Sequence, residues 1–279
     1  KVPAGTIYGF IGPNGSGKTT TIRMIMNIFK PDSGNIFVNG QQITGSRLKR
    51  VGYLPEERGI YKKMKVYEVL KFHGTLKKVD NINKEIEYWL DKLGLSEKAN
   101  NKVETLSKGM IQKIQFIATV IDRPDIIILD EPFSGLDPVN AVLLKESLLE
   151  LQKNGATIIF STHDMNMAEK MCDYIFMIFK GKKVLDGTLS DIQNIYGSNT
   201  IILKTESGAD VLQELEGIEN INDYGQVQEI RLSQGTDPQY VLEEIIKKTR
   251  VFKFEITKPS LNDIFIRIAS PERKEEKYA

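Results

Sequence analysis

Gly12-Pro13-Asn14-Gly15-Ser16-Gly17-Lys18-Thr19-Thr20 follows the pattern G-x-x-x-x-G-K-[ST], and this stretch decides the fold. An apolar, strand-like run, Thr6 to Ile11, comes directly before it. After it, apolar residues recur at the i, i+3, i+4, i+7 spacing of a helix that is buried on one face, namely Ile22, Ile25, Met26 and Phe29. The order of strand, glycine-rich turn and helix predicts a phosphate-binding loop.

Backbone chemistry explains why such a loop binds phosphate. Glycines allow successive N–H groups to point inward, where a Cβ atom would block the phosphate. The following helix adds its unpaired N–H groups and the positive end of its dipole. Lys18 is placed to reach the β- and γ-phosphates, and the Thr19 hydroxyl to bind a Mg²⁺ ion that bridges them. The alternative is a glycine turn that only caps a helix, but the bare pattern arises by chance in about one percent of chains this long.

Composition limits the class of protein. The chain has 279 residues, enough for a large domain with or without a small one. Its formal net charge is +1 and it has no sustained basic stripe, so nucleic acid is not expected as a partner. The single cysteine, Cys172, excludes an internal disulfide and fits a reducing cytosol. The longest apolar runs are far shorter than a membrane span of about 18 residues, so we expect a soluble chain.

Polar residues follow two apolar, strand-like runs. Ile126 to Leu129 leads into Asp130-Glu131, and Ala156 to Ser161 leads into Thr162-His163. Fully apolar runs of this kind suit strands buried on both faces of a parallel sheet, and ligands bind at the carboxyl ends of such strands. Taken alone, an Asp-Glu pair is commonly a helix cap and a single His is commonly structural. Near a phosphate loop, both become candidates for chemistry.

The remaining pattern predicts the architecture. Strands alternate with helices over residues 1–197, which implies an α/β domain with a mostly parallel sheet. Helical periodicity dominates about residues 60–122, where we expect a helical subdomain. Over residues 198–270 the order β-α-β-β-α-β is that of a small ferredoxin-like α+β domain. The charged residues 271–279 are expected to form a disordered tail.

Four motifs occur in one order: the phosphate loop, Leu106-Ser107-Lys108-Gly109, the apolar run ending in Asp130-Glu131, and Ser-Gly-Leu-Asp137 followed by His163. Together they resemble the ATP-binding subunits of ABC transporters over about residues 4–195, which implies a P-loop NTPase fold. The second domain is similar to the C-terminal extension of subunits that pair with ABC-2 type permeases, often exporters. The resemblance implies an ATPase that powers transport through a separate membrane protein.

The resemblance also implies roles for individual residues. The loop from Gly12 to Thr20 would bind the phosphates of ATP, and Thr19 and Asp130 would hold Mg²⁺. Glu131 is expected to polarise the attacking water as general base, and His163 to contact the γ-phosphate and orient that water. Lys18 would neutralise phosphate charge during transfer.

A dimer follows from the same resemblance. Ser107 and Gly109 match the signature motif, which binds the γ-phosphate held by the opposite subunit, and Asp137 matches a residue that communicates across the dimer. Hydrolysis then requires two head-to-tail subunits, either two copies of this chain or this chain and a paralogous subunit. Through the permease, the pair would lie on the cytoplasmic face of the membrane.

Three residues depart from the family pattern. Lys108 replaces a glycine and Met110 a glutamine of the signature, and Glu56 replaces a glutamine that ligates Mg²⁺ and senses the permease. A carboxylate can also ligate Mg²⁺, so we keep Glu56 as a metal ligand. The first strands of the family, with the aromatic residue that stacks on adenine, would precede Lys1, and we expect them to be missing.

Two alternatives compete with a transport ATPase. The first is a soluble mechanical ATPase of the same superfamily, acting on ribosomes or DNA. Its DNA-linked members insert long coiled coils between the phosphate loop and the signature, whereas about ninety residues without sustained heptads lie there in this chain. Its translation-linked members carry two ATPase halves, and this chain has one. A GTPase would need Asn-Lys-x-Asp, but Asn83-Lys84-Glu85-Ile86 and Asn101-Lys102-Val103-Glu104 do not end in Asp.

Overall fold

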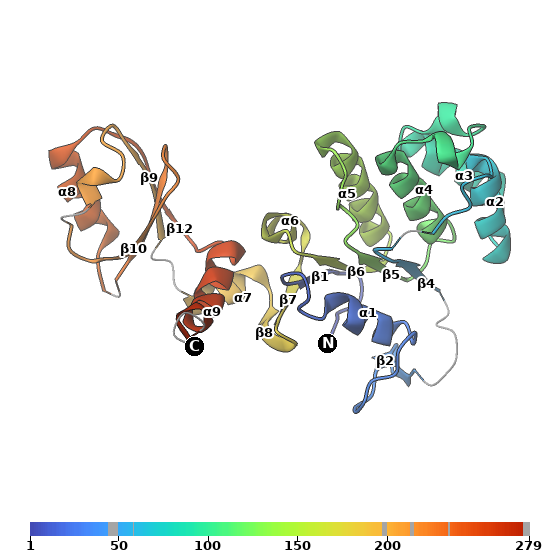
Figure 1. Cartoon of the computed structure of the whole chain (residues 1–279), viewed down its shortest axis with the longest axis horizontal. Coiled ribbons are helices and arrows are strands. Elements are labelled where there is room, and N and C mark those ends of the chain that lie inside the picture. Colours follow the sequence, from blue (N-terminus) through green and yellow to red (C-terminus); the bar gives the residue numbers. More distant parts are fainter. Residues whose placement is uncertain (44–49, 58, 197–199, 213–214, 234, 276–279) are drawn as a thin grey trace. The chain divides into compact units, whose positions relative to one another are not determined.

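The computed structural model describes residues 1–43, 50–57, 59–196, 200–212, 215–233 and 235–275 (Figure 1). The chain divides into two compact units, Lys1–Gly187 and Thr188–Ala279. This boundary precedes the expected one between residues 197 and 198, because helix α7 (Leu189–Tyr196) is bonded to the second unit. Gln193 Nε2 donates a hydrogen bond to the Pro259 carbonyl (3.0 Å), and Arg267 Nη1 donates one to the Tyr196 carbonyl (3.1 Å).

A six-stranded sheet of order β4-β5-β6-β1-β7-β8 forms the centre of the first unit. Neighbouring strands are parallel except for the antiparallel pair β7 and β8, which confirms the predicted mostly parallel sheet. The strands are β1 (Ile7–Ile11), β4 (Val51–Leu54), β5 (Ile126–Asp130), β6 (Thr157–Thr162), β7 (Tyr174–Phe179) and β8 (Lys182–Gly187). A separate ribbon pairs β2 (Phe37–Val38) with β3 (Gln41–Gln42).

Helices cover both faces of this sheet (Figure 1). Successive strand residues point to opposite faces. Ile128 therefore packs with Ile22 of α1, whereas its neighbour Ile127 shares a core with Leu148 of α5. The α-helices of the unit are α1 (Lys18–Ile25), α2 (Val66–Leu76), α3 (Ile82–Lys92), α4 (Lys108–Val120), α5 (Pro138–Lys153) and α6 (Met165–Met171).

Helix α1 is shorter than its apolar spacing predicts. It ends at Ile25, and Asn27 adopts the left-handed backbone conformation (φ 55°), which stops the helix. Phe29, predicted to lie on the buried helix face, is 48% exposed.

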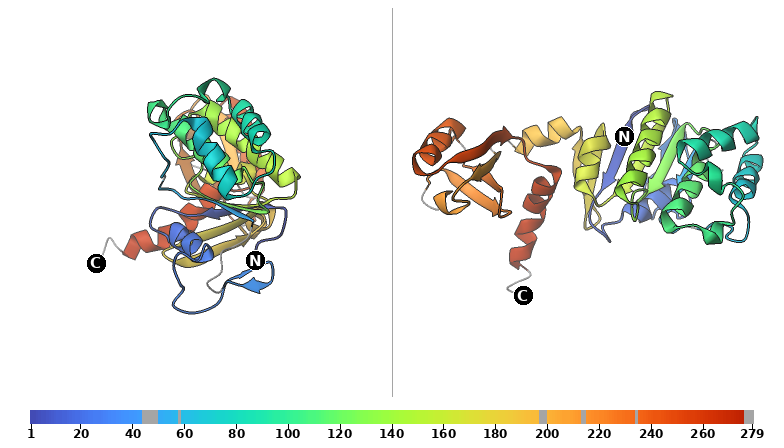
Figure 2. Two further views of the ribbon diagram at one scale, coloured as in Figure 1. Left: turned by 90° about the vertical axis from the view of Figure 1, so that its right-hand side faces the viewer. Right: turned by 90° about the horizontal axis from the view of Figure 1, so that it is seen from above.

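Helices α2 to α4 gather beside the β4 edge of the sheet (Figures 1 and 2). Their core includes Trp89 and Phe116, whose rings meet edge to face with centroids 5.9 Å apart. Two short 3₁₀ turns, Ser96–Lys98 and Val103–Thr105, connect α3 to α4. The second turn ends just before Ser107, which caps the N-terminus of α4.

The second unit has an antiparallel sheet of order β10-β11-β9-β12. Numbered within the unit this order is 2-3-1-4, which confirms the predicted ferredoxin-like arrangement. Its elements are β9 (Thr200–Thr205), β10 (Ile218–Asp223), β11 (Gln228–Leu232), α8 (Pro238–Lys248) and β12 (Val251–Thr257). The first predicted helix is only a 3₁₀ turn, Asp210–Leu212, and residues 213–214 of that prediction lie outside the described residues.

The C-terminal residues correct one prediction. Helix α9 runs from Leu261 to Glu275, so residues 271–275 of the expected disordered tail are helical, and residues 276–279 lie outside the described residues. The helix has a reciprocal cap, because Ser260 Oγ accepts from the Asp263 N–H (3.1 Å) and the Ser260 N–H donates to Asp263 Oδ2 (3.0 Å). Its last residues, Glu-Arg-Lys-Glu, are strong helix formers despite their charge.

Candidate functional site

The predicted phosphate loop joins β1 to α1 and has the backbone that its glycines permit. Gly12, Gly15 and Gly17 all have positive φ angles, of 151°, 76° and 107°. At Gly12 the requirement is also one of space, because a Cβ atom would lie 2.2 Å from the carbonyl oxygen of Ile178. Gly17 is the N-cap of α1 and has the left-handed conformation. The free N–H groups of the first helical turn therefore follow the loop directly.

Lys18 folds back over the loop. Its Nζ donates to the carbonyl oxygens of Gly12 (2.8 Å) and Pro13 (3.1 Å). The side chain is only 6% exposed, so burial and these bonds hold the ammonium beside the loop. A cation held there can neutralise a phosphate that the loop N–H groups bind.

Asp130 and Glu131 stand at the carboxyl end of β5, as predicted. Asp130 is fully buried, and its Oδ1 accepts a hydrogen bond from the Ser161 hydroxyl of β6. Its other oxygen, Oδ2, is buried and has no hydrogen-bond partner among the described residues. A buried carboxylate oxygen of this kind needs a ligand, because an unpaired buried polar atom is costly.

The Glu131 carboxylate lies between two predicted site residues. Its Oε1 is 3.8 Å from Lys18 Nζ and 3.0 Å from His163 Nδ1. Glu131 is almost completely buried, whereas His163 is about half exposed at the end of β6. The sheet therefore brings residues from three distant parts of the sequence to one point beside the phosphate loop.

A pocket of about 250 Å³ opens at this point. It is lined by residues of the loop and α1 together with two carboxylates, namely Asn14, Gly15, Gly17, Lys18, Thr19, Thr20, Glu56 and Glu131. Glu56 thus reaches the same space as Glu131. Tyr53 lies nearby, and its burial, followed by the charge of Asp130, raises the pKa of its hydroxyl.

The signature residues form a second cluster. Ser107 caps α4 by accepting from the Met110 N–H (3.3 Å), and Asp137 caps α5 by accepting from the Asn140 N–H (3.0 Å). The hydrogen bonds from the backbone and then the side chain of Asn140 hold the pKa of the Asp137 carboxyl below its usual range. A Cβ atom at Gly109 would lie 3.6 Å from Leu136, so the two motifs are in contact. Neither motif is among the described residues that line the phosphate-loop pocket.

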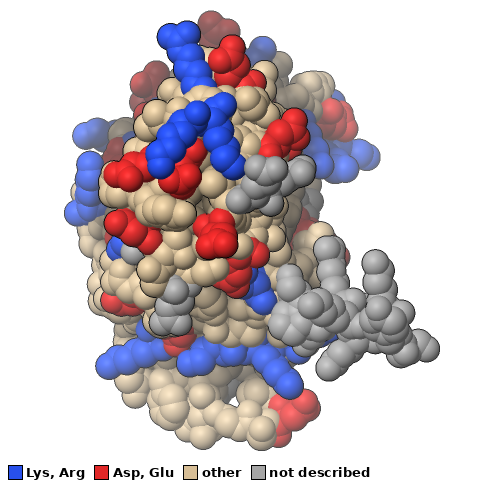
Figure 3. Space-filling model, turned by 90° about the vertical axis from the view of Figure 1, so that its left-hand side faces the viewer, with Lys and Arg blue, Asp and Glu red and all other residues tan. Residues whose placement is uncertain are grey.

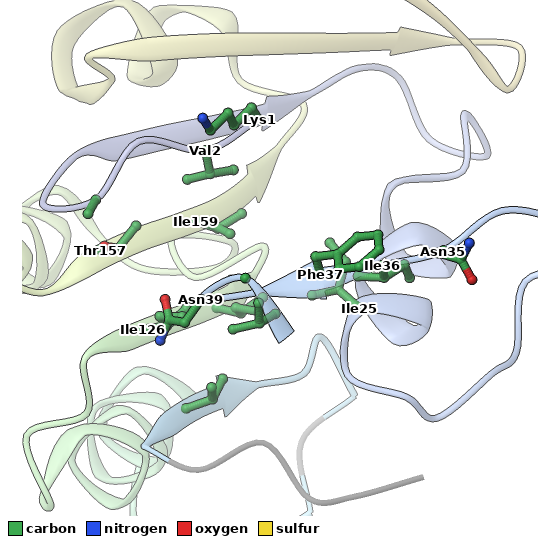
Figure 4. Close-up of a pocket in the computed structure, with 15 residues that line it drawn as sticks. Lys1, Val2, Ile25, Asn35, Ile36, Phe37, Asn39, Ile126, Thr157 and Ile159 are labelled. Carbon is green, nitrogen blue, oxygen red and sulfur yellow. The ribbon is translucent and has the colours of Figure 1, made fainter. Parts of the chain in front are cut away.

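A larger pocket of about 750 Å³ lies elsewhere in the first unit. Figure 4 shows its walls, which come from the N-terminal segment, α1, the Phe37 ribbon and strands β5 and β6. Apolar side chains such as Ile25, Ile126 and Ile159 dominate them, and none of the predicted site residues is among the described residues that line it. The smaller pocket is therefore the candidate site, because convergent charged groups rather than volume indicate chemistry.

The surface and the helices set further limits. On the face shown in Figure 3, acidic side chains lie among the Lys and Arg side chains. Within the described residues, no helix combines the length and the apolarity that crossing a bilayer requires. The same part of the chain holds no cluster of three or more His, Cys, Asp or Glu residues suited to a metal ion.

Sequence reasoning missed two polar residues that touch the Asp130-Glu131 segment. Ser161 bonds to both residues, and Gln112 of α4 donates to the carbonyl of the next residue, Pro132. Both are buried, but a serine in an apolar strand and a glutamine in a helix are unremarkable in sequence. The available signal was that Ser161 is a polar residue in a strand predicted to be buried; the sequence carries no comparable signal for Gln112.

Comparison with known proteins gives a consistent result. Residues 1–134 match the ABC transporter family, and residues 187–269 match the C-terminal domain of DrrA1-3-like ATP-binding proteins. Over 258 residues the chain is 40% identical to an uncharacterized ABC transporter ATP-binding protein of Alkalihalophilus pseudofirmus, covering 92% of this chain and 97% of that protein. It is 34% identical over 223 residues to Nod factor export ATP-binding protein I of Burkholderia lata, covering 75% and 73% of the two chains.

A solved structure supports the same assignment. The structure of an ATP-binding subunit of an ABC transporter matches with a TM-score of 0.66 and 30% sequence identity, covering 70% of this chain and 84% of that one. The chain therefore belongs to the ATP-binding subunits of ABC transporters, which are ATPases.

Proposed function

We propose that this chain hydrolyses ATP to power export through a separate ABC-2 type permease. The match of residues 187–269 to a DrrA1-3-like domain and the likeness to a relative named for Nod factor export support the exporter type. In this proposal, ATP closes two subunits on each other and hydrolysis lets them open. The permease would hold the pair on the cytoplasmic face of the membrane.

The position of the Glu131 carboxylate carries the catalytic part of the proposal. It faces the phosphate-loop pocket within 3.8 Å of Lys18 Nζ and 3.0 Å of His163 Nδ1. With ATP in the loop, a water beside Glu131 attacks the γ-phosphorus, the bond to the ADP oxygen breaks, and the carboxylate takes the proton. His163 orients the water, and Lys18 with the α1 N-terminus neutralises the phosphate charge.

The chemistry of the donor set fits Mg²⁺. The Asp130 carboxylate is buried with one oxygen unpaired, and Thr19 and Glu56 line the adjacent pocket. Mg²⁺ characteristically takes few protein oxygens and completes its shell with water and phosphate, so two carboxylates and a hydroxyl suffice to hold it. Bound there, the ion would neutralise charge on the β- and γ-phosphates.

The signature cluster supports a second subunit in the active site. Ser107 and Gly109 begin α4, so its N-terminal N–H groups and the Ser107 hydroxyl are available to an anion. They do not line the pocket of their own chain, and Ser107 is exposed. We therefore assign them, with Asp137, to the γ-phosphate bound by a second copy or a paralogous subunit in a head-to-tail dimer.

Exposed aromatic side chains support contact with the permease. Tyr61 is 56% exposed and meets Phe72 of α2 edge to face, with ring centroids 5.5 Å apart. Tyr61 follows the Glu56 loop within a few residues of the sequence, and we propose that a permease segment bound at Tyr61 and Phe72 also contacts that loop. Co-purification of a multi-span membrane protein with the tagged chain would support this role, whereas recovery with ribosomes or DNA alone would favour the mechanical ATPase.

Replacing Glu131 tests the mechanism. Glu131→Gln should abolish steady-state hydrolysis while ATP binding is retained, and an ATP-bound dimer should accumulate. ATPase, nucleotide-binding and scattering assays on the full chain would measure these three effects. Glu97→Gln, in the 3₁₀ turn after α3, is the matched control and should behave like the parent chain. Unchanged hydrolysis by Glu131→Gln would contradict the proposal.

A further inference from the structure

Ser161 occupies an unusual position at the carboxyl end of β6. The sheet register places it directly opposite Asp130, and it is fully buried. Its Oγ donates a hydrogen bond to Asp130 Oδ1 and accepts one from the Glu131 N–H at 3.0 Å. A hydroxyl has one proton to give and lone pairs to receive, so this single group satisfies both neighbours in the only consistent direction.

The bond to Glu131 acts on a strained residue. Glu131 has a φ of 50°, a left-handed conformation that is unfavourable for a residue with a Cβ atom. Such a conformation persists only where the surroundings fix it. Ser161 holds the peptide N–H on one side of Glu131, and on the other side the Pro132 carbonyl accepts from Gln112. The direction in which the Glu131 carboxylate leaves the backbone depends on these contacts.

The bond to Asp130 acts on a side chain. Because Ser161 engages Oδ1, the carboxylate cannot rotate freely, and Oδ2 is the oxygen that stays unpaired. We infer that Ser161 is a positioning residue for ATP hydrolysis, whose one hydroxyl sets the Asp130 side chain and the Glu131 backbone together. This inference rests on the proposed roles of Asp130 and Glu131.

A buried serine with a purely structural role looks different. Ser147 of α5 is equally buried, but its Oγ donates to the Leu143 carbonyl of its own helix at 2.8 Å. This bond is local, and it involves no predicted site residue. Ser147→Ala is therefore a matched control, because it removes a buried hydroxyl of the same kind from the same unit.

The test compares Ser161→Ala, Ser161→Cys and Ser147→Ala in the full chain. Loss of an orienting bond behind active groups costs about 10- to 100-fold. We expect Ser161→Ala to lower kcat by this factor with a smaller change in KM. It should also raise the Mg²⁺ concentration that half-saturates binding of a non-hydrolysable ATP analogue, a readout that needs no turnover. Cysteine is a weaker donor of similar shape, so Ser161→Cys should fall between Ala and the parent.

Two outcomes separate this inference from the proposed function. If Glu131→Gln is inactive while Ser161→Ala keeps the parent kcat and Mg²⁺ dependence, the positioning role is wrong and the catalytic assignment stands. If Glu131→Gln stays active, the catalytic assignment itself fails. Should Ser161→Ala not fold, Ser161→Cys decides the question, because parent-like values of kcat and Mg²⁺ affinity would overturn the inference. Losses of kcat and Mg²⁺ affinity in Ser147→Ala equal to those in Ser161→Ala would also overturn the inference.

Discussion

The two units of this chain are both sheets packed with helices, yet within the described residues the candidate active site lies in the first. In the first unit, β1, β5 and β6 run parallel and end at the same edge, where the phosphate loop, Glu131 and His163 meet. In the second unit every neighbouring pair of strands is antiparallel, so successive strands end at opposite edges. Strand direction, more than secondary-structure content, decides where polar residues can converge.

Acidic groups that are partly or fully buried show the same contrast. In the first unit, Oδ2 of Asp130 has no hydrogen-bond partner among the described residues, and the adjacent Glu131 lines the smaller pocket. In the second unit, Glu229 of β11 shares a hydrogen bond with Asp263 of α9, and Arg267 lies near both. Two carboxyl groups can share a hydrogen bond only if one of them keeps a proton. This cluster satisfies itself and attaches α9 to the sheet, whereas the first unit leaves its charges available to a ligand.

Glycine substitutions in the two units should differ most in their effect on the rate of ATP hydrolysis. Gly12→Ala would bring a Cβ atom to 2.2 Å from the Ile178 carbonyl and displace the phosphate loop. Since a displacement of about 1 Å can cost 100-fold in rate, we expect ATP hydrolysis to fall by at least about that factor. Gly217→Ala in the second unit also meets a close neighbour, Thr236 at 2.6 Å, but should leave hydrolysis within about twofold of the parent.

Gly15→Ala is the control for backbone strain, because its φ is also positive while its Cβ would meet nothing within 4 Å. Its loss of ATPase activity should be smaller than that of Gly12→Ala. Equal losses from Gly12→Ala and Gly217→Ala would break the contrast between the units.

Replacement of Glu56 sharpens the comparison by testing whether this carboxylate belongs to the metal site of the first unit. Glu56 lines the pocket with a carboxylate, so Glu56→Gln, which removes that charge, should weaken the attraction for Mg²⁺. We expect the Mg²⁺ concentration for half-maximal hydrolysis to rise about tenfold. The adjacent Glu57, which is exposed and is not among the described lining residues, provides the control variant Glu57→Gln. Identical Mg²⁺ titrations for the two variants would remove Glu56 from the metal site.

The smallest expected effect is a pH dependence of the second unit. Burial, with the Asp263 hydrogen bond next, raises the pKa of Glu229 from 4.5 to about 7. Between these values the folded unit holds a proton that the unfolded chain has released, so stability falls as the pH rises through this window and is level above it. We expect melting to shift by on the order of a few degrees, with lower hydrogen-exchange protection factors in α9 at pH 7 than at pH 5, each referenced to the intrinsic exchange rate at its own pH.

Glu229→Gln should remove the slope of stability against pH, because the amide does not titrate. Glu255→Gln, at an exposed ion pair with Lys253, should keep it. A slope that survives in Glu229→Gln would show that another group titrates.

Residue patterns predicted the fold well where local signals were strong. The phosphate loop combines glycines, a lysine and flanking apolar periodicity, and the apolar runs before Asp130 and His163 fixed two central strands. The unit boundary was missed because the Thr188 to Asp191 cap marks only where α7 begins. The contacts of that helix, to Pro259 and Arg267, come from residues far along the chain.

Residue patterns predicted that Glu131 and His163 follow neighbouring strand ends near the phosphate loop, but not which residues support them. Ser161 lies 31 positions from Asp130, and Gln112 lies 20 positions from Pro132. Such contacts depend on strand register and on how α4 packs, which a single sequence does not specify. The left-handed backbone of Glu131 was equally invisible, because nothing about a glutamate after a strand indicates a positive φ.

The left-handed backbone conformation of Glu131 has a consequence for how the protein could evolve. A glycine at position 131 would relax the main chain, and an asparagine would tolerate its angle better than glutamate does. With the catalytic role proposed for Glu131, selection for heat resistance alone would favour losing the carboxylate, and selection for turnover would retain it. Thermostabilised forms of this ATPase should be checked first at this residue, where robustness and activity make opposite demands.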